Sequence, residues 1–167
     1  MDGTRLPWSI FGAIALCSVA QAVSAFPRLP ERVASHFDSS GMPNGWMSKE
    51  GFFVVYAVMI GVSAFVGFYV PRQIETKSPA RINLPHREYW LAPDRRAETL
   101  AYLERYFAWY ACALLLILVL AMGLAIEANF TSPPRMPSKP ILLVIGAFVV
   151  FNVLSVIHLL RHFSTPR

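Results

Sequence analysis

The sequence predicts an all-α integral membrane protein with four transmembrane helices. Of the 167 residues, 55% are hydrophobic and 15% are charged, whereas an ordinary soluble domain is about 25% charged. Four stretches contain no Asp, Glu, Lys or Arg, and each approaches the roughly 20 residues that a helix needs to cross a bilayer. These spans are residues 7–26, 52–70, 106–126 and 141–160. We therefore expect a single membrane domain with a short structured loop at 27–51 and a longer loop at 71–105.

The distribution of basic residues predicts the orientation. The N-terminus, the 71–105 loop and the C-terminus carry one, seven and two Lys or Arg residues, whereas the 27–51 and 127–140 loops carry three and two. Basic residues concentrate in cytoplasmic loops, so we expect both termini and the 71–105 loop in the cytoplasm and the other two loops outside. The basic residues form no long run and alternate with acids, which gives no support to nucleic-acid binding.

The first span is expected to stay in the protein. Arg5, the apolar run and Val23-Ser24-Ala25 together resemble a cleavable secretory signal, which is the alternative. The apolar stretch of 20 residues is longer than the usual signal core of about 7 to 15. Cys17 and Cys112 lie inside spans, where we expect them to pack as small hydrophobic side chains.

Small residues at helical spacing predict close contacts within the bundle, with a homodimer seam as the alternative. Those on the first span are Ser9, Ala13, Cys17, Ala20 and Ser24, and those on the second are Ala57, Gly61, Ser63 and Gly67.

The outer loop is expected to begin with one or two helical turns. Pro30 suits the first position of a helix, and Leu29, Val33 and Phe37 recur every four residues, which would place them on one apolar face.

A turn is expected next, over residues 41–45, because proline fixes one dihedral while Asn44 and Gly45 tolerate positive ones. Trp46 is expected to anchor the loop at the lipid headgroups. Ser48 is expected to cap the second transmembrane helix, with Glu50 near its positive end.

The cytoplasmic loop is expected to contain an amphipathic helix that begins near Pro93. Leu100, Leu103 and Phe107 would share one face of it. This helix either lies along the inner interface or runs directly into the third span.

The fourth span carries a polar stripe of Asn152, Ser155, His158 and His162, which helical spacing places on one face. Polar groups inside a membrane face other helices or a wet cavity. We expect packing contacts between helices, and an ion or proton path is the alternative. No charged residue lies within any span.

Two strings in the loops resemble a known family. They are Leu29-Pro30-x-x-Val33-x-x-His36-Phe37-x-x-x-Gly41-x-Pro43-Asn44-Gly45-Trp46-x-Ser48-Lys49 and Asn83-x-Pro85-x-x-x-Tyr89-Trp90-Leu91-Ala92-Pro93-x-Arg95-Arg96. Both are similar to motifs of the bacterial membrane family called domain of unknown function 1648, which also occurs in SdpI-type toxin-immunity proteins. The resemblance implies a multi-pass protein of the bacterial cytoplasmic membrane, with family activity mostly unassigned.

These features favour a binding or sensing protein, with toxin immunity as its sharper form. Besides the lipid bilayer, the expected partner is a peptide or envelope protein at the outer loop. The candidate binding residues are His36, Phe37, Gly41, Pro43, Asn44, Gly45, Trp46 and Lys49. The alternative function is a small channel or transporter that uses the polar face formed by Asn152, Ser155 and His158.

Enzyme motifs are absent from the sequence: it has no His-Glu-x-x-His, nucleophile elbow or phosphate-binding glycine loop. We therefore expect neither catalysis nor a cofactor. Glu31, His36 and Asp38 are an alternative zinc site, but their spacing fits no compact ligand motif, so no metal is expected.

Overall fold

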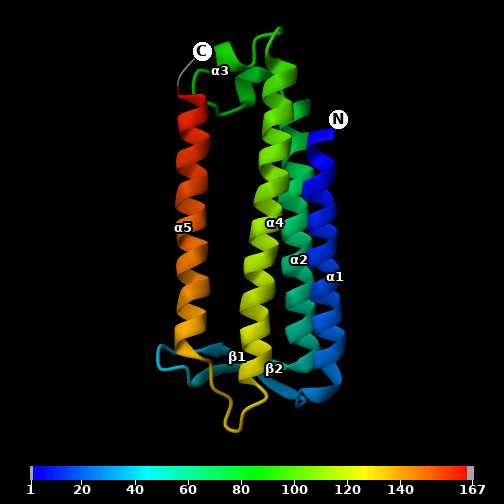
Figure 1. Cartoon of the computed structure of the whole chain (residues 1–167), viewed down its shortest axis with the longest axis vertical. Coiled ribbons are helices and arrows are strands. Elements are labelled where there is room, and N and C mark those ends of the chain that lie inside the picture. Colours follow the sequence, from blue (N-terminus) through cyan, green and yellow to red (C-terminus); the bar gives the residue numbers. More distant parts are fainter. Residues whose placement is uncertain (1, 165–167) are drawn as a thin grey trace.

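The protein consists of four long helices that are closed at one end by a β-hairpin (Figure 1). The computed structural model describes residues 2–164. The long helices are α1 (Arg5–Ala25), α2 (Lys49–Thr76), α4 (Arg96–Ala128) and α5 (Ser138–Phe163). The hairpin strands are β1 (Arg32–Phe37) and β2 (Pro43–Ser48), the short helix α3 covers Arg87–Trp90, and 3₁₀ turns lie at Asp2–Thr4, Phe26–Arg28 and Pro79–Arg81.

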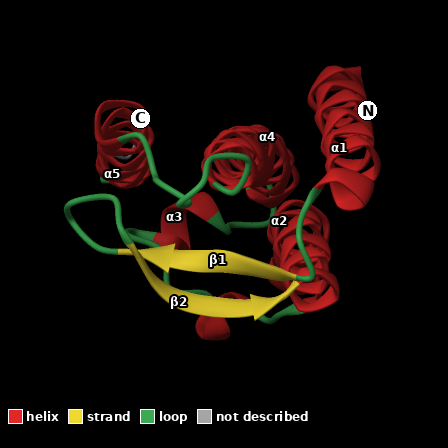
Figure 2. Ribbon diagram, turned by 90° about the horizontal axis from the view of Figure 1, so that it is seen from below, coloured by secondary structure: helices red, strands yellow, loops and turns green. Residues whose placement is uncertain are grey.

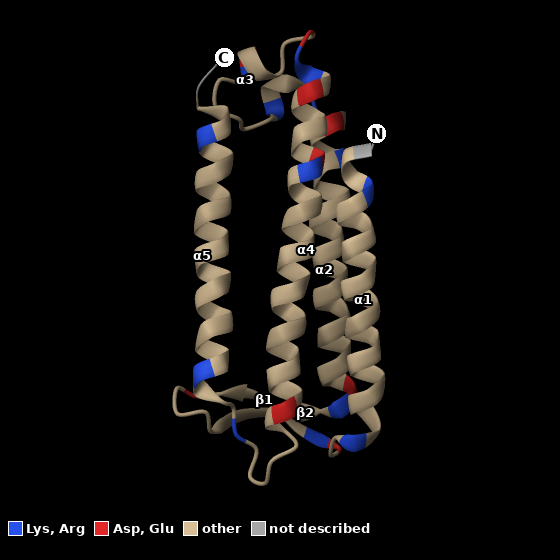
Figure 3. Cartoon of the chain, viewed as in Figure 1, with Lys and Arg blue, Asp and Glu red and all other residues tan. Residues whose placement is uncertain are grey.

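All four long helices are long and apolar enough to cross a membrane, which confirms the predicted fold class. In Figure 3 the charged residues gather at the two ends of the molecule, and the helix segments between them carry none. The start of α1 and the end of α5 lie at the end opposite the hairpin (Figure 1). We refer to these as the hairpin end and the termini end.

Helix α4 is the centre of the bundle. It runs unbroken for 33 residues, or about 50 Å at 1.5 Å per residue, so its charged first part extends beyond the roughly 30 Å hydrocarbon core. The predicted amphipathic helix therefore continues directly into the third span, and it begins at Arg96 instead of Pro93. Of its expected apolar face, Leu103 is buried, while Leu100 and Phe107 are half-buried.

Helices α1, α2 and α4 pack together, whereas α5 stands beside α4 (Figure 2). Phe163 is the one α5 residue that is buried, so most of the apolar surface of this helix is left for lipid. The core at the hairpin end includes Val33, Tyr56 and Ile126, and a second cluster contains Phe11 and Leu115.

Of the small residues expected to make close contacts between helices, only some are buried. On α2, Ser63 and Gly67 are buried, and a Cβ on Gly67 would lie 2.7 Å from both Ala111 and Trp8. In contrast, Ala57 and Gly61 are exposed. The expected α1 ridge is also exposed at every position, because α1 packs through a different face that contains Pro7, Phe11, Ser18 and Ala25. The prediction that this ridge contacts other helices of the bundle is thus wrong.

The predicted helical turns after Pro30 are wrong, because this segment forms strand β1. The strand pairs in antiparallel fashion with β2, with Val33 opposite Met47 and Ala34 opposite Trp46. A spacing of four is even, so it places residues on one face of a strand as readily as on one face of a helix. The pairing with β2 supplies backbone hydrogen bonds that a two-turn helix would leave open at its ends.

The chain reverses earlier than expected, at Asp38 to Gly41. The backbone amide of Gly41 donates to the Asp38 carbonyl at 3.0 Å, and Gly41 has a φ of +81°. Asn44 and Gly45 lie within β2 instead, and among the described residues the positive-φ positions are Gly41 and His86. The expected positive dihedral at Gly45 is therefore wrong.

Ser48 caps α2 as predicted. Its side-chain oxygen accepts a hydrogen bond from the backbone amide of Gly51 at 3.1 Å, and Glu50 occupies the first turn. The cap joins β2 to α2 directly and thereby fixes the hairpin relative to the bundle.

Candidate binding site at the hairpin end

The hairpin is attached to the bundle through Asn129 at the end of α4. Its side-chain Oδ1 accepts from the Ala34 amide at 2.7 Å, and its Nδ2 donates to the carbonyls of Ala34 and Ala125, both at 2.9 Å. Asn129 is only 6% exposed and Ala34 is fully buried. The amide side chain thus pairs with β1 as another strand would.

A second attachment joins the start of β1 to the start of α2. Lys49 Nζ donates to Glu31 Oε1 at 3.0 Å, and the Lys49 amide donates to the Glu31 carbonyl at 2.9 Å. The Lys49 ammonium also lies 4.8 Å from the centre of the Phe26 ring. Lys49, predicted as a binding residue, therefore has structural partners.

The turn between the strands is organised by the Asp38 carboxylate. Its Oδ1 accepts from the Ser40 hydroxyl at 2.6 Å and from the amides of Ser40 and Met42 at 2.9 and 3.0 Å. The Ser40 hydroxyl, followed by the Met42 amide, lowers the pKa of Asp38, because hydrogen bonds to a carboxylate favour its ionised form. The turn therefore keeps a negative charge at neutral pH.

A pocket of about 400 Å³ lies between this turn and the first turns of α5. One wall is polar and comes from the hairpin, and the other is apolar and comes mainly from α5. The lining residues are Ser35, His36, Phe37, Asp38, Ser39, Gly41, Met136, Ser138, Ile141, Leu142 and Ile145. Such a pocket suits a ligand with an apolar part and a polar part.

Of the eight candidate binding residues, His36, Phe37 and Gly41 line this pocket. The other five shape the hairpin or lie on its outer surface. Pro43 pairs with Phe37, Gly45 lies opposite His36, and Trp46 is 45% exposed. Asn44 is exposed as well. The α5 part of the pocket was missed because nothing in the sequence indicates that residues 138–145 lie beside the hairpin.

The three side chains of the alternative zinc site, those of Glu31, His36 and Asp38, each contact other residues. Glu31 pairs with Lys49, Asp38 holds the turn, and His36 Nδ1 lies 3.1 Å from the Ser35 hydroxyl. Within residues 2–164, no group of three His, Cys, Asp or Glu side chains is arranged to hold a metal ion.

The polar stripe on α5 faces three tyrosines of α4 that were not among the predicted site residues. Tyr110 donates to Asn152 Oδ1 at 2.6 Å and Tyr106 donates to the Ser155 carbonyl at 3.0 Å. At the third level the Tyr102 hydroxyl lies 3.0 Å from His158 Nε2. The spacing of four between the tyrosines was the available signal, since it places them on one helix face.

This tyrosine ladder of Tyr102, Tyr106 and Tyr110 begins inside the membrane at Tyr110 and runs to the termini end, where Tyr102 lies. There the ring of His162 stacks on Tyr102 with centroids 3.8 Å apart, and the Trp90 indole N–H donates to the Phe163 carbonyl at 3.0 Å. On the other side of Asn152, residues 140–151 are apolar, as are residues 111–126 apart from Cys112. The contacts therefore support interhelical packing and describe no polar route across the bilayer.

We expect Asn152→Leu to lower the free energy of unfolding by about 0.6 kcal/mol, the average for hydrogen bonds between membrane helices. The Tyr110 hydroxyl loses its acceptor in this variant. Unfolding by dodecyl sulfate, followed by tryptophan fluorescence, measures the change. Tyr110→Phe should cost about the same, and the double variant should cost little more than either. Additive losses would show that the two side chains do not act as a pair.

The fold and the site together define a small multi-pass membrane protein whose hairpin closes one end of a helical bundle. Residues 13–60 match the family described as Domain of unknown function (DUF1648). The match covers most of α1, the hairpin and the first three turns of α2, and it confirms the family indicated by the first motif. The chain matches no curated protein and no solved structure.

Proposed function

We propose that the protein binds an amphipathic segment of a peptide or envelope protein in the pocket at the hairpin end. The observation that carries this proposal is the pairing of a polar hairpin wall with an apolar α5 wall around about 400 Å³. Ligand pockets commonly enclose about 300 to 1,000 Å³. The pocket is thus large enough for one or two side chains of a bound segment.

The charges around the pocket favour a basic group on the ligand. The Asp38 carboxylate lines the polar wall, and its hydrogen bonds keep its pKa low. Ile141, Leu142 and Ile145, in the first two turns of α5, offer an apolar surface on the other wall. A segment with an apolar side chain next to a Lys or Arg would satisfy both walls.

Toxin immunity is the sharper form of this proposal, and its support is the resemblance of the outer motif to SdpI-type proteins. The channel or transporter alternative stays a prediction. Among the described residues, no hydrogen bond of the α4–α5 ladder lies beyond Tyr110 and Asn152, so no observation favours it.

The binding function is tested by deleting the gene and challenging cells with a panel of cationic amphipathic peptides. We expect deletion to sensitise cells to at least one peptide and the wild-type gene to restore tolerance. Leu142→Trp should fail to restore it, because the indole would fill the pocket. Leu143→Trp is the matched control, since Leu143 is exposed and outside the pocket.

His36→Gln is expected to reduce protection as well, while thermal stability stays within a few degrees, because His36 is exposed and its side chain hydrogen-bonds with its neighbour Ser35. Equal protection by both tryptophan variants, or no sensitivity to any peptide, would contradict the proposed pocket. Protection that disappears when the proton gradient is collapsed would favour transport instead.

We further propose that the protein lies in the bacterial cytoplasmic membrane with both termini inside. The support is the excess of Lys and Arg at the termini end, ten against five. A reporter that is active only outside the cytoplasm should be active when fused after Asn44 or Pro134. The same reporter fused after Lys77 or at the end of the chain should be silent. The opposite pattern would reverse the orientation.

A further inference from the structure

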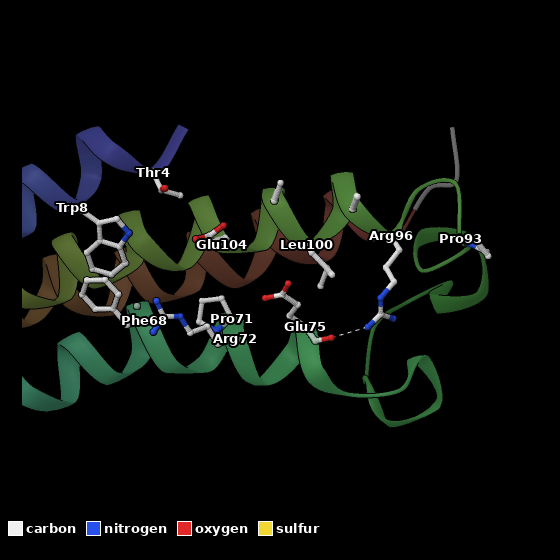
Figure 4. A pocket seen from close by; sticks show the side chains of 13 residues that line it. Thr4, Trp8, Phe68, Pro71, Arg72, Glu75, Pro93, Arg96, Leu100 and Glu104 are labelled. Carbon is white, nitrogen blue, oxygen red and sulfur yellow. Dashed lines mark hydrogen bonds between the residues drawn. The ribbon is translucent and has the colours of Figure 1, made fainter. Parts of the chain in front are cut away.

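A large cleft lies at the termini end, far from the hairpin pocket. It encloses about 830 Å³ between α2 and α4 and reaches the start of α1. Figure 4 shows the side chains around it. The residues that the following argument uses are Trp8, Phe68, Arg72, Glu75, Arg96 and Glu104.

The deep end of the cleft is aromatic. The rings of Trp8 and Phe68 stack with centroids 3.3 Å apart. Trp8 can approach α2 this closely because Gly67 has no side chain, and a Cβ there would lie 2.7 Å from the indole. Both aromatic residues belong to stretches without charged residues, so this end of the cleft lies at the edge of the hydrocarbon region.

The outer part of the cleft is charged, and its charges are balanced. Arg72 and Glu75 come from α2, and Arg96 and Glu104 come from α4. Arg96 is already engaged, because its guanidinium donates to the carbonyls of Glu75 and Lys77, both at 2.9 Å. Those bonds satisfy carbonyls at the C-terminal end of α2.

Three charged side chains remain for a ligand. Within the described part of the chain, the side chains of Arg72, Glu75 and Glu104 take part in no hydrogen bond or ion pair. Figure 4 shows them around the same space between the two helices. One cation and two carboxylates match a ligand that carries both an anionic and a cationic group.

We propose that this cleft binds the headgroup of an aminophospholipid of the phosphatidylethanolamine type. The Arg72 guanidinium would hold the phosphate, since arginine binds phosphate through two parallel hydrogen bonds. Glu75 and Glu104 would accept hydrogen bonds from the ammonium group, and the Trp8–Phe68 pair would contact the glycerol and the first acyl carbons. Anionic lipids favour pockets with an excess of basic residues, which this cleft lacks.

The test uses the purified full chain, stripped of lipid and offered equal amounts of phosphatidylethanolamine, phosphatidylcholine and phosphatidylglycerol. Native mass spectrometry measures the lipid retained. We expect preferential retention of phosphatidylethanolamine, because the quaternary amine of phosphatidylcholine has no N–H to donate and phosphatidylglycerol has no amine. Glu104→Gln and Arg72→Gln should each weaken this retention about tenfold, as expected for the loss of a hydrogen bond to a charged group.

Glu98→Gln and Arg161→Gln are the matched controls, because both residues are exposed and lie outside the cleft. Ala101→Trp, which fills the cleft and leaves its charges in place, should also abolish the preference. Equal retention of the three lipids, or equal loss in the controls, would overturn the proposal. Soluble glycerophosphoethanolamine at the same concentration should not displace the lipid, and full displacement would assign the site to a free solute instead.

Discussion

Replacement of Asn129 by leucine should lower the free energy of unfolding by about 2 to 6 kcal/mol, because a buried donor or acceptor left without a partner costs about 1 to 3 kcal/mol. The amide and carbonyl of Ala34 both bond to the Asn129 side chain, and Ala34 is fully buried. Leucine has a similar volume but offers neither a donor nor an acceptor. Dodecyl sulfate unfolding of the purified protein measures the loss.

The control for this prediction is Asn44→Leu, which makes the same chemical change at an exposed position of the hairpin itself. Asn44 is exposed on β2, so its replacement should change the free energy of unfolding by less than about 0.5 kcal/mol, as is usual for surface positions. A second expected difference is local. Hydrogen exchange at Ala34 should accelerate in Asn129→Leu and stay slow in Asn44→Leu. Equal effects of the two changes would mean that Asn129 does not hold the hairpin.

The four membrane spans could be predicted because the bilayer imposes a length and a polarity that are visible residue by residue. A segment such as 141–160 needs no knowledge of its neighbours to be identified as a span. Packing within the membrane follows different rules. Ala57/Gly61 and Ser63/Gly67 look alike in the sequence, yet only the second pair is buried, because which face meets α4 depends on the arrangement of the whole bundle.

The hairpin was harder to predict because its stability comes from distant contacts. Val33 and Phe37 have a spacing that suits a helix or a strand, and the strand is selected by pairing with Pro43–Ser48 and by Asn129, which is 95 residues from Ala34 in the sequence. The same limit applies to the site. His36 and Gly41 were identified as candidates, but Ile141 and Ile145 complete the pocket only because α5 begins beside the turn.

Several residues of the family motif have structural roles in the hairpin. Ser48 caps α2, Lys49 pairs with Glu31, and Gly41 adopts the positive φ of the turn. These motif residues therefore specify the hairpin. The α5 residues of the proposed binding pocket lie outside the matched segment 13–60, so the match carries no information about them.

Gly41→Ala should be the most damaging small change within the hairpin motif, with an expected loss of about 2 to 5 kcal/mol in the free energy of unfolding. Two costs combine. A non-glycine residue at φ +81° is strained, and a Cβ at this position would lie 2.5 Å from the Met136 carbonyl oxygen. That oxygen belongs to the backbone, and the Met136 amide donates to the Gly41 carbonyl at 3.0 Å, so the chain cannot move aside without losing the bond.

Gly45→Ala is the matched comparison, because Gly45 has an ordinary strand conformation and its new Cβ would meet His36 side-chain atoms at 3.0 Å. His36 is exposed, so its ring can turn away, whereas its Cβ, also 3.0 Å away, cannot. We therefore expect a loss of about 1 to 2 kcal/mol, smaller than that of Gly41→Ala. Dodecyl sulfate unfolding of both variants gives the ranking. Since Met136 also lines the pocket, Gly41→Ala should reduce peptide protection while Gly45→Ala retains it. A greater loss of stability for Gly45→Ala would show that the chain reverses at Asn44–Gly45 after all, and that the pocket at the hairpin end is assembled differently.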